Sequence, residues 1–336
     1  FLTSHSRPSG WKSPRWTTSL DQGLRGVDDL RDPARFMRDA RGPAGKEAHV
    51  ADKSWNPTIA VSTACFDGYS LEKTLKELAA IAVPSVELAY IDGYVSNFSE
   101  ALFSDENAKT VRGMFDAAGV SCTAVSAHTD LSTGDALDRV RRRIRFAAAI
   151  GAERVVTNAA IVENEATFLQ NLETLAREAE EAGVDLLLEN PGDGRQNVVN
   201  DGATAAALEK RLELPRVYIN YDFGNVVSHF YEKVRPEEDW EPVRRIARYF
   251  HIKDVRKDGE DYSYPEIGTG ILDYAAILAA IGEDKLVPAL GLELPLRLRR
   301  RPDASPYRIE EPLSVEEIRG IVERSLSFLN RHLRLE

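Results

Sequence analysis

From Thr58 to its end, the chain alternates between short apolar runs and longer amphipathic stretches. The apolar runs are rich in β-branched residues, whereas the stretches between them repeat Ala and Leu at helical spacing. Several of these helical stretches reach a glycine just before the next run, as helix C-caps do. Eight runs predict strands, at residues 58–66, 85–90, 121–128, 153–160, 184–190, 216–223, 249–255 and 288–295.

Continuous apolar strands that alternate with helices predict a parallel sheet covered on both faces. Eight such units predict a closed (β/α)8 barrel of the α/β class, since closure removes both edges of the sheet. An open doubly wound sheet is the alternative. It would place a glycine-rich phosphate loop after its first strand, and the segment ACFDGYS at residues 64–70 offers none.

Residues 1–56 show neither the two-residue period of strands nor the 3.6-residue period of helices, and they contain scattered prolines and glycines. They predict an irregular N-terminal extension, and residues 57–336 predict the catalytic barrel domain. Trp11 and Trp16 are costly to leave in water, so we expect the extension to pack on the barrel or on a partner subunit. A partly disordered arm is the alternative.

The composition narrows the classes of partner. A net charge of -11 argues against nucleic acid or an anionic membrane, because phosphate binding needs a clustered positive field. No apolar run approaches a membrane span, so we expect a soluble, cytoplasmic protein. Cys65 and Cys122 lie inside apolar runs, which is typical of reduced, buried thiols. One basic cluster, Arg297 with Arg299–Arg301, is interpreted as a solvated loop or helix surface, with contact to an anionic substrate or a subunit as the alternative.

Four predicted strands end on side chains that can bind a metal ion. They are Glu189 in LLLENPG, Asp222 in VYINYDFGN, His251 in YFHIKD and Glu293 in LGLELP. In a barrel of this kind the carboxyl ends of the strands share one mouth, so these residues meet there. A single acidic residue at a strand end is often a helix N-cap. Several carboxylates in one cleft repel one another, however, and a bound cation relieves that repulsion. Carboxylates with one imidazole suit Mn²⁺, Mg²⁺ or Co²⁺ and admit Zn²⁺.

The series ENPG, DFGN, HIKD, GTG and LELP, in this order over residues 58 to about 330, resembles the xylose isomerase-like sugar isomerase/epimerase superfamily. Its fold is the TIM barrel, and the ketose 3-epimerases are the branch that this chain is most similar to. The resemblance implies that Glu189, Asp222, His251 and Glu293 bind one divalent metal ion, Mn²⁺ by preference. It also implies a small sugar or glycoside as the substrate. A homo-oligomer, or a hetero-oligomer with a small second subunit, is expected.

The implied chemistry is removal of a proton next to a metal-bound carbonyl. As the resemblance implies, Glu189 and Glu293 would serve the two faces of the sugar, and transfer between faces gives epimerisation. His128 at the end of the third strand is the other candidate base, with a structural hydrogen bond as the alternative. A scaffold that binds a structural cation is the non-enzymatic alternative. A multinuclear zinc nuclease needs more histidines than the six in this chain.

One position departs from the family pattern. Ketose 3-epimerases carry a substrate-contacting His three residues after the strand-six Asp, and this chain has Asn225 there. Asn cannot carry a proton at neutral pH. His229 is interpreted as a surface residue. The departure keeps a second function open, in which a 3-keto-glycoside is cleaved by elimination. That lyase resembles the large subunit of C-glycoside deglycosidases, which works with a small β-rich partner.

Further residues are predicted around the substrate. Period two along the seventh strand places Lys253 on the mouth side with His251, while Asp254 points away and anchors the following loop. The GTG segment at residues 268–270 is interpreted as a tight loop that offers N–H groups to the substrate. The predicted substrate contacts, each with a cap or surface ion pair as its alternative role, are Glu87, Asn225, Lys253, Arg195 and Arg256.

Overall fold

The computed structural model describes residues 55–96 and 98–335. All but the end of the predicted extension over residues 1–56 therefore lies outside the described residues. The described chain forms a closed barrel of eight parallel strands in the order β1-β10-β7-β6-β5-β4-β3-β2, which confirms the predicted fold. These strands are β1 Thr58–Ser62, β2 Ser85–Ala89, β3 Cys122–Ser126, β4 Arg154–Asn158, β5 Asp185–Glu189, β6 Val217–Asp222, β7 Tyr249–Ile252 and β10 Ala289–Leu292.

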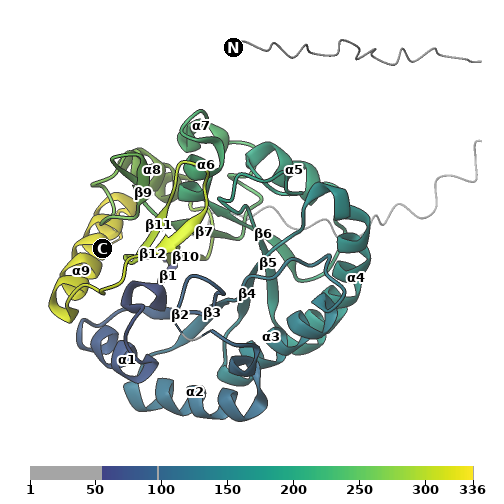
Figure 1. Ribbon diagram of the computed structural model, residues 1–336, viewed down its shortest axis with the longest axis horizontal. Coiled ribbons are helices and arrows are strands. Elements are labelled where there is room, and N and C mark those ends of the chain that lie inside the picture. The colour runs from purple at the N-terminus through teal and green to yellow at the C-terminus, as the bar shows by residue number, and fades with distance from the viewer. Residues whose placement is uncertain (1–54, 97, 336) are drawn as a thin grey trace, which may run out of the picture. The chain divides into compact units, whose positions relative to one another are not determined.

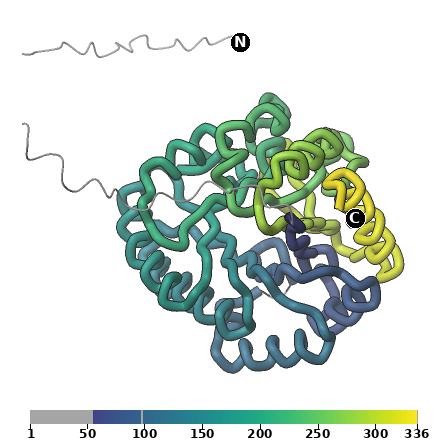
Figure 2. Tube along the Cα trace, turned by 180° about the vertical axis from the view of Figure 1, so that it is seen from behind, coloured from purple at the N-terminus to yellow at the C-terminus, as the bar shows by residue number. Residues whose placement is uncertain are grey.

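Helices surround the barrel and connect its strands (Figure 1). The last helix returns to the first, so the ring closes between them, as the view from behind shows (Figure 2). The α-helices are α1 Leu71–Ala80, α2 Asp105–Ala118, α3 Ala136–Ile150, α4 Glu165–Ala182, α5 Gly202–Glu209, α6 Phe223–Phe230, α7 Pro236–Asp239, α8 Tyr274–Asp284 and α9 Val315–Leu333, with short 3-10 helices η1 Thr63–Phe66, η2 Glu100–Phe103 and η3 Val162–Asn164. None of the helices in the described part of the chain combines the length and apolar character needed to cross a membrane.

Three of the glycines that close predicted helical stretches are Gly151, Gly183 and Gly282. The first two end a helix as predicted, and the third does not. Gly151 and Gly183 end α3 and α4 in the left-handed conformation, at φ of 84° and 70°. Gly282 instead lies inside α8. A Cβ at Gly282 would come within 2.7 Å of the Leu333 carbonyl oxygen, so this glycine lets α9 pack closely on α8.

Period two along the strands divides the barrel interior into layers. Ala124, Val156, Leu187, Tyr249 and Ala289 form an apolar cluster inside the barrel. One step of two residues nearer the carboxyl ends, the inward positions carry polar side chains, such as Glu189 on β5 and His251 on β7. The apolar layer therefore lies beneath a polar layer inside the barrel.

A second, four-stranded sheet lies in front of the barrel strands in Figure 1. Its order is β12-β11-β9-β8, and its strands are β8 Arg256–Asp258, β9 Asp261–Ser263, β11 Leu298–Arg300 and β12 Pro306–Arg308. The interpretation of the basic cluster as a solvated loop or helix surface is wrong at Arg300. This residue lies on β11 and is 3% exposed.

Both cysteines are free and buried, which confirms the sequence prediction. Burial raises the pKa of the Cys65 and Cys122 thiols to about 12. At about pH 8, an unperturbed thiol is roughly one quarter thiolate, whereas a thiol of this pKa is about one part in ten thousand thiolate. We therefore expect neither thiol to react with Ellman's reagent in the folded protein within minutes, and both to react at once in guanidinium chloride. Rapid reaction of either thiol without unfolding would contradict the burial.

Candidate metal centre

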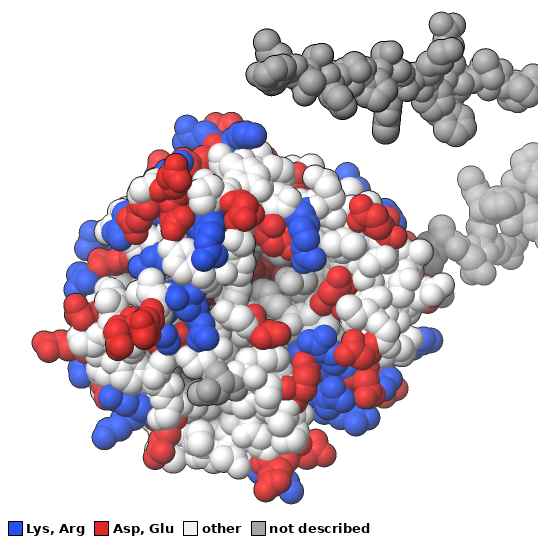
Figure 3. Space-filling model, in the orientation of Figure 1, with Lys and Arg blue, Asp and Glu red and all other residues white. Residues whose placement is uncertain are grey.

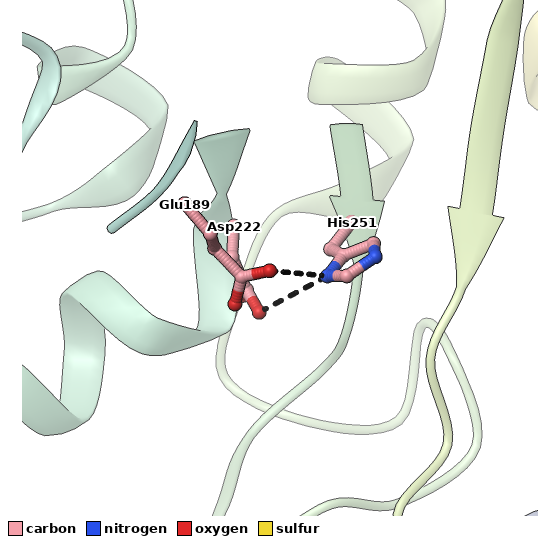
Figure 4. Close-up of side chains that lie close together, drawn as sticks. All are labelled: Glu189, Asp222 and His251. Carbon is pink, nitrogen blue, oxygen red and sulfur yellow. Dashed lines mark ion pairs between the residues drawn. The ribbon is translucent and has the colours of Figure 1, made fainter. Parts of the chain in front are cut away.

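Three strands bring the core of the predicted metal site together. Glu189 ends β5, Asp222 ends β6 and His251 lies on β7, and one ligand atom from each lies within 4.8 Å of the others. The two carboxylates point toward one nitrogen of the imidazole (Figure 4). All three side chains are buried, so water screens their charges little.

The Nδ1 atom of His251 faces three carboxylates. Glu189 Oε2 is 3.1 Å away, Glu293 Oε2 is 3.4 Å away and Asp222 Oδ2 is 3.8 Å away. Both His251 Nδ1 and Asp222 Oδ2 are buried, and their neighbours within the described residues are charged: carboxylates face the nitrogen, and the Lys253 ammonium lies 2.6 Å from the oxygen. A donor set of several carboxylate oxygens and one imidazole nitrogen, gathered around one buried point, fits a divalent metal ion.

Glu87 holds the other side of the imidazole. Its Oε2 atom accepts hydrogen bonds from His251 Nε2 at 3.1 Å and from the Tyr249 hydroxyl at 2.9 Å, and Ser126 Oγ donates to Oε1 at 2.9 Å. A carboxylate on the far nitrogen of a metal-binding histidine is a common arrangement, since it fixes the ring and leaves Nδ1 for the metal. Glu87 has no exposed surface, so this position does not fit the predicted contact with a substrate hydroxyl.

The neighbouring carboxylates control the charge of the imidazole. Burial alone would lower the pKa of His251, but Glu87 and Glu189 outweigh burial and raise this pKa well above its usual value. These carboxylates therefore favour the protonated imidazole. Metal binding at Nδ1 would displace its proton.

Asp222 caps a helix and also lies in the candidate metal group. It is the N-cap of α6, because its Oδ1 atom accepts the Asn225 backbone N–H at 2.9 Å. Its Oδ2 atom faces His251 and Lys253 instead. Burial is the main cause that raises the pKa of Asp222 to about 7, with Glu189 and Glu293 adding to it and Lys253 opposing it.

Two amides fix the Glu189 carboxylate. Asn220 Nδ2 donates to Oε2 and Asn225 Nδ2 donates to Oε1, both at 2.8 Å. Burial would raise the pKa of Glu189, but His251, His128 and Lys253 together lower it to about 2. Glu189 is therefore ionised at neutral pH and turned toward the imidazole. Asn225 lies at the site as predicted, but its amide N–H groups bond Glu189 and the Asn190 carbonyl.

Lys253 lies on the mouth side with His251, as the strand period predicts. Its Nζ atom is 2.6 Å from Asp222 Oδ2 and 2.8 Å from Glu293 Oε2. Burial would lower the pKa of Lys253, but these two carboxylates raise it well above the usual value. The structure thus brings Glu293 to the site, with one oxygen held by an ammonium group.

A cavity of about 420 Å³ opens onto this group. Its lining includes His128, Glu189, Asn225, Lys253 and Glu293. The viewed face is hollowed near its middle, with charged side chains of both signs around the hollow (Figure 3). A second hollow of about 400 Å³, beside Asp67 and Tyr69, contains none of the predicted ligands, so the first is the candidate substrate cavity.

Residues 75–319 match the sequence model of a family described as "Xylose isomerase-like TIM barrel". The match spans more than half of the chain. The chain belongs to the xylose isomerase-like TIM barrel family.

Solved structures with the same fold include several members that act on sugars. One is 3-keto-D-glucoside 4-epimerase from E. coli, which is 16% identical, with 82% of this chain and 100% of that chain covered and a TM-score of 0.59. D-psicose 3-epimerase with D-tagatose from Clostridium cellulolyticum H10 is 11% identical, with 82% and 99% covered and a TM-score of 0.63. A xylose isomerase-like TIM barrel protein from Mycobacterium smegmatis in complex with magnesium is 17% identical, with 83% and 98% covered and a TM-score of 0.60.

At these identities the structural likeness shows the fold, and function rests on the residues of this chain. A comparison with curated protein sequences gave no match. Within the family, the structure separates the remaining predicted residues into those at the cavity and those away from it.

His128 and Arg195 line the cavity, and Arg256 does not appear in its lining. His128 Nδ1 is 3.1 Å from Asn158 Oδ1, while Nε2 is 3.7 Å from Glu189 Oε2 and has no hydrogen-bond partner among the described residues. Arg195 is a rim residue whose side chain is 62% exposed and pairs with Asp193. Arg256 pairs with Asp258 and is 51% exposed, so the structure does not bring it to the metal group.

Two further interpretations need correction. His229 was expected at the surface, but it is buried, and its Nδ1 lies 3.1 Å from the Pro191 carbonyl oxygen. The Gly268 and Gly270 N–H groups both donate to Asp254 Oδ2 at 2.9 Å, so they are not available to a substrate. The same bonds confirm that Asp254 anchors this loop.

Sequence reasoning gave contact with an anionic substrate or a subunit as the alternative for the basic cluster, but it did not single out Arg300, which lines the cavity together with Tyr94. The RRR run did carry a signal, since three adjacent cations on one strand cannot all face the same way. The run alone does not show which cation is buried.

Metal binding should stabilise the folded protein. Mn²⁺ at a hundredfold excess over its dissociation constant adds about 2.7 kcal/mol, which raises Tm by several degrees. We expect Asp222→Asn to remove most of this shift, because the amide still accepts the α6 cap bond but is a poorer metal ligand. Differential scanning fluorimetry with and without EDTA measures the effect. Glu163→Gln on exposed η3 is the matched control, and an unchanged shift in Asp222→Asn would remove Asp222 from the ligand set.

Gly291 should be needed for the imidazole position. It pairs with His251 in register, and a Cβ there would lie 2.6 Å from His251 Cδ2 and 2.9 Å from Tyr249 Cε1. We expect Gly291→Ala to displace the ring and weaken metal affinity by about 10- to 100-fold, as losses around metal ligands do. Gly113→Ala in α2 is the control, since nothing lies within 4 Å of its added Cβ. Equal Mn²⁺ affinity in both variants, measured by calorimetry, would show that the ring tolerates the methyl group.

Proposed function

We propose that the protein is a divalent-metal-dependent isomerase or epimerase of a keto sugar. The observation that carries the proposal is the buried group of Glu189, Asp222 and His251, of which Glu189 lines a cavity large enough for a small molecule. Family membership supports the same class of enzyme, since the structures of similar fold include sugar epimerases. Mn²⁺ is the metal we favour for a donor set of this kind.

Glu189, Asp222 and His251 would hold the metal ion, and Glu293 would join them once its oxygen is shared with or released by Lys253. The ion supplies polarisation of a ketone carbonyl, which acidifies the neighbouring C–H bond. The amides of Asn220 and Asn225 orient Glu189, and Glu87 orients His251. These contacts hold Glu189 and His251 in position before any substrate binds.

Two carboxylates flank the position of a bound sugar. Glu189 comes from β5 and Glu293 follows β10, and in the barrel order β6 and β7 lie between these two strands. Proton removal by one carboxylate and return from the other face gives epimerisation, whereas return to the neighbouring carbon gives isomerisation. His128 Nε2, which has no hydrogen-bond partner among the described residues, is the other group placed to exchange a proton. Lys253 is placed to donate to a substrate oxygen next to Glu293.

A second candidate function is elimination from a 3-keto-glycoside. The observation in its favour is Asn225, whose amide N–H groups are used on Glu189 and Asn190, so no acid–base group occupies this position. A proton can then be removed beside the ketone while the group beta to the carbanion leaves. If the protein is this lyase, we expect it to work with a small second subunit.

Incubation in deuterated water separates the candidates. With Mn²⁺ and a panel of ketoses and 3-keto-glycosides, we expect deuterium beside the carbonyl with the carbon skeleton intact, measured by NMR. Release of an aglycone would instead establish the lyase. Glu293→Gln should lower turnover by about 10²- to 10⁴-fold, the usual contribution of a general acid or base, and Glu163→Gln should not. Full turnover in Glu293→Gln would show that Glu293 does not carry the proton.

A further inference from the structure

Arg300 is a buried cation without a carboxylate partner. It lies on β11 and is 3% exposed, and its hydrogen bonds within the described residues all go to neutral groups. Arginine is rarely buried this far unless an acidic group accompanies it, because removing a charge from water is costly. A buried, unpaired guanidinium beside the candidate substrate cavity therefore needs a reason.

The guanidinium is held by neutral acceptors. Nε donates to the Tyr264 hydroxyl at 3.1 Å, Nη1 donates to the Ala304 carbonyl at 2.7 Å, and Nη2 bonds the Tyr94 hydroxyl. Three of its five N–H groups are thus used, and the charge is retained. Tyr94 follows β2 whereas Tyr264 follows β9, so the group is fixed from two sides.

The other basic side chains in the cavity lining all have acidic partners. Arg195 pairs with Asp193 at 2.7 Å and Arg139 pairs with Glu100 at 3.0 Å. Lys253 pairs with Asp222 and Glu293, as described above. Among the cations that line the described cavity, Arg300 is the one that lacks a carboxylate within ion-pair distance.

Tyr264 contacts both Arg300 and the Lys253 ammonium of the candidate metal group. The ammonium is 5.5 Å from the centroid of the Tyr264 ring, and the Tyr264 hydroxyl accepts from Arg300. Asp92, Asp130 and Asp193 also line the cavity, and the Asp193 charge acts on Arg300 although its ion pair is with Arg195. The cavity as a whole is therefore not basic, and any anion must be recognised by its position.

We propose that Arg300 binds a carboxylate of the substrate, which makes the substrate an acidic keto sugar or keto-glycoside rather than a neutral one. The proposal rests on the proposed function above. A planar guanidinium matches a carboxylate with two parallel N–H bonds. One substrate carboxylate balances the single unpaired charge, whereas a phosphate group carries close to two negative charges.

Binding by the metal-loaded protein tests the proposal without depending on turnover. Isothermal titration calorimetry compares 5-keto-D-gluconate, D-fructose and D-fructose 6-phosphate. We expect 5-keto-D-gluconate to bind about 10- to 100-fold tighter than D-fructose, as a charged hydrogen-bond pair predicts. No preference for the acid, or tightest binding of the phosphate, would overturn the carboxylate assignment. The deuterium experiment can fail while this preference holds, so the two failures are distinguishable.

Two variants test whether Arg300 causes the preference for 5-keto-D-gluconate over D-fructose. We expect Arg300→Gln to abolish this preference, and Arg301→Gln, at the exposed neighbour, to retain it. A preference that survives Arg300→Gln would mean that the carboxylate binds the metal ion instead, which overturns the proposal. Arg300→Lys keeps the charge but loses the planar fork, and it serves if the glutamine variant does not fold. We expect most of the preference to be lost in Arg300→Lys, and an unchanged preference there would overturn the proposal.

Discussion

Repulsion between buried carboxylates is the constraint on which the centre of this barrel depends. Glu87, Glu189, Asp222 and Glu293 are all nearly inaccessible to water and lie around a single imidazole. In a low-dielectric interior such charges must be offset by cations and hydrogen-bond donors. His251 and Lys253 supply the cations, while the amides of Asn220 and Asn225 and the hydroxyls of Ser126 and Tyr249 supply donors. The polar layer is therefore one connected network rather than four independent residues.

The same side chains serve both the fold and the site. Asp222 shows this most directly, since one oxygen caps α6 and the other faces the imidazole. The cap bond orients the carboxylate, because the helix fixes the backbone N–H to which it bonds. Gly291 acts similarly on β10, where the absence of a side chain leaves room for the His251 ring. Positions usually attributed to secondary structure thus shape the candidate metal centre.

The barrel and its four strand-end residues could be predicted from the sequence because both follow from short-range pattern. Apolar runs define the strands, and the carboxyl ends of parallel strands share one mouth. That pattern does not show how deeply a side chain is buried. Glu87 was therefore expected to contact the substrate, whereas its carboxylate lies against the Nε2 atom of His251. His229 was misjudged because α6 is buried on every side, so helical period carries no information there. Arg300 lies on a strand of only three residues. An alternating pattern cannot be recognised over so few positions, so the sequence does not predict that Arg300 is buried.

Lys253 connects the metal group with the rest of the cavity. Its ammonium contacts two of the four predicted ligands and lies over the ring of Tyr264, whose hydroxyl holds Arg300. A divalent ion bound by all four ligands would repel the ammonium, so Lys253 must then move or turn toward the substrate. The oxygen that it releases on Glu293 is the one that faces His251. Under the proposed function, metal binding and the arrangement of the substrate cavity would therefore be coupled through this one side chain.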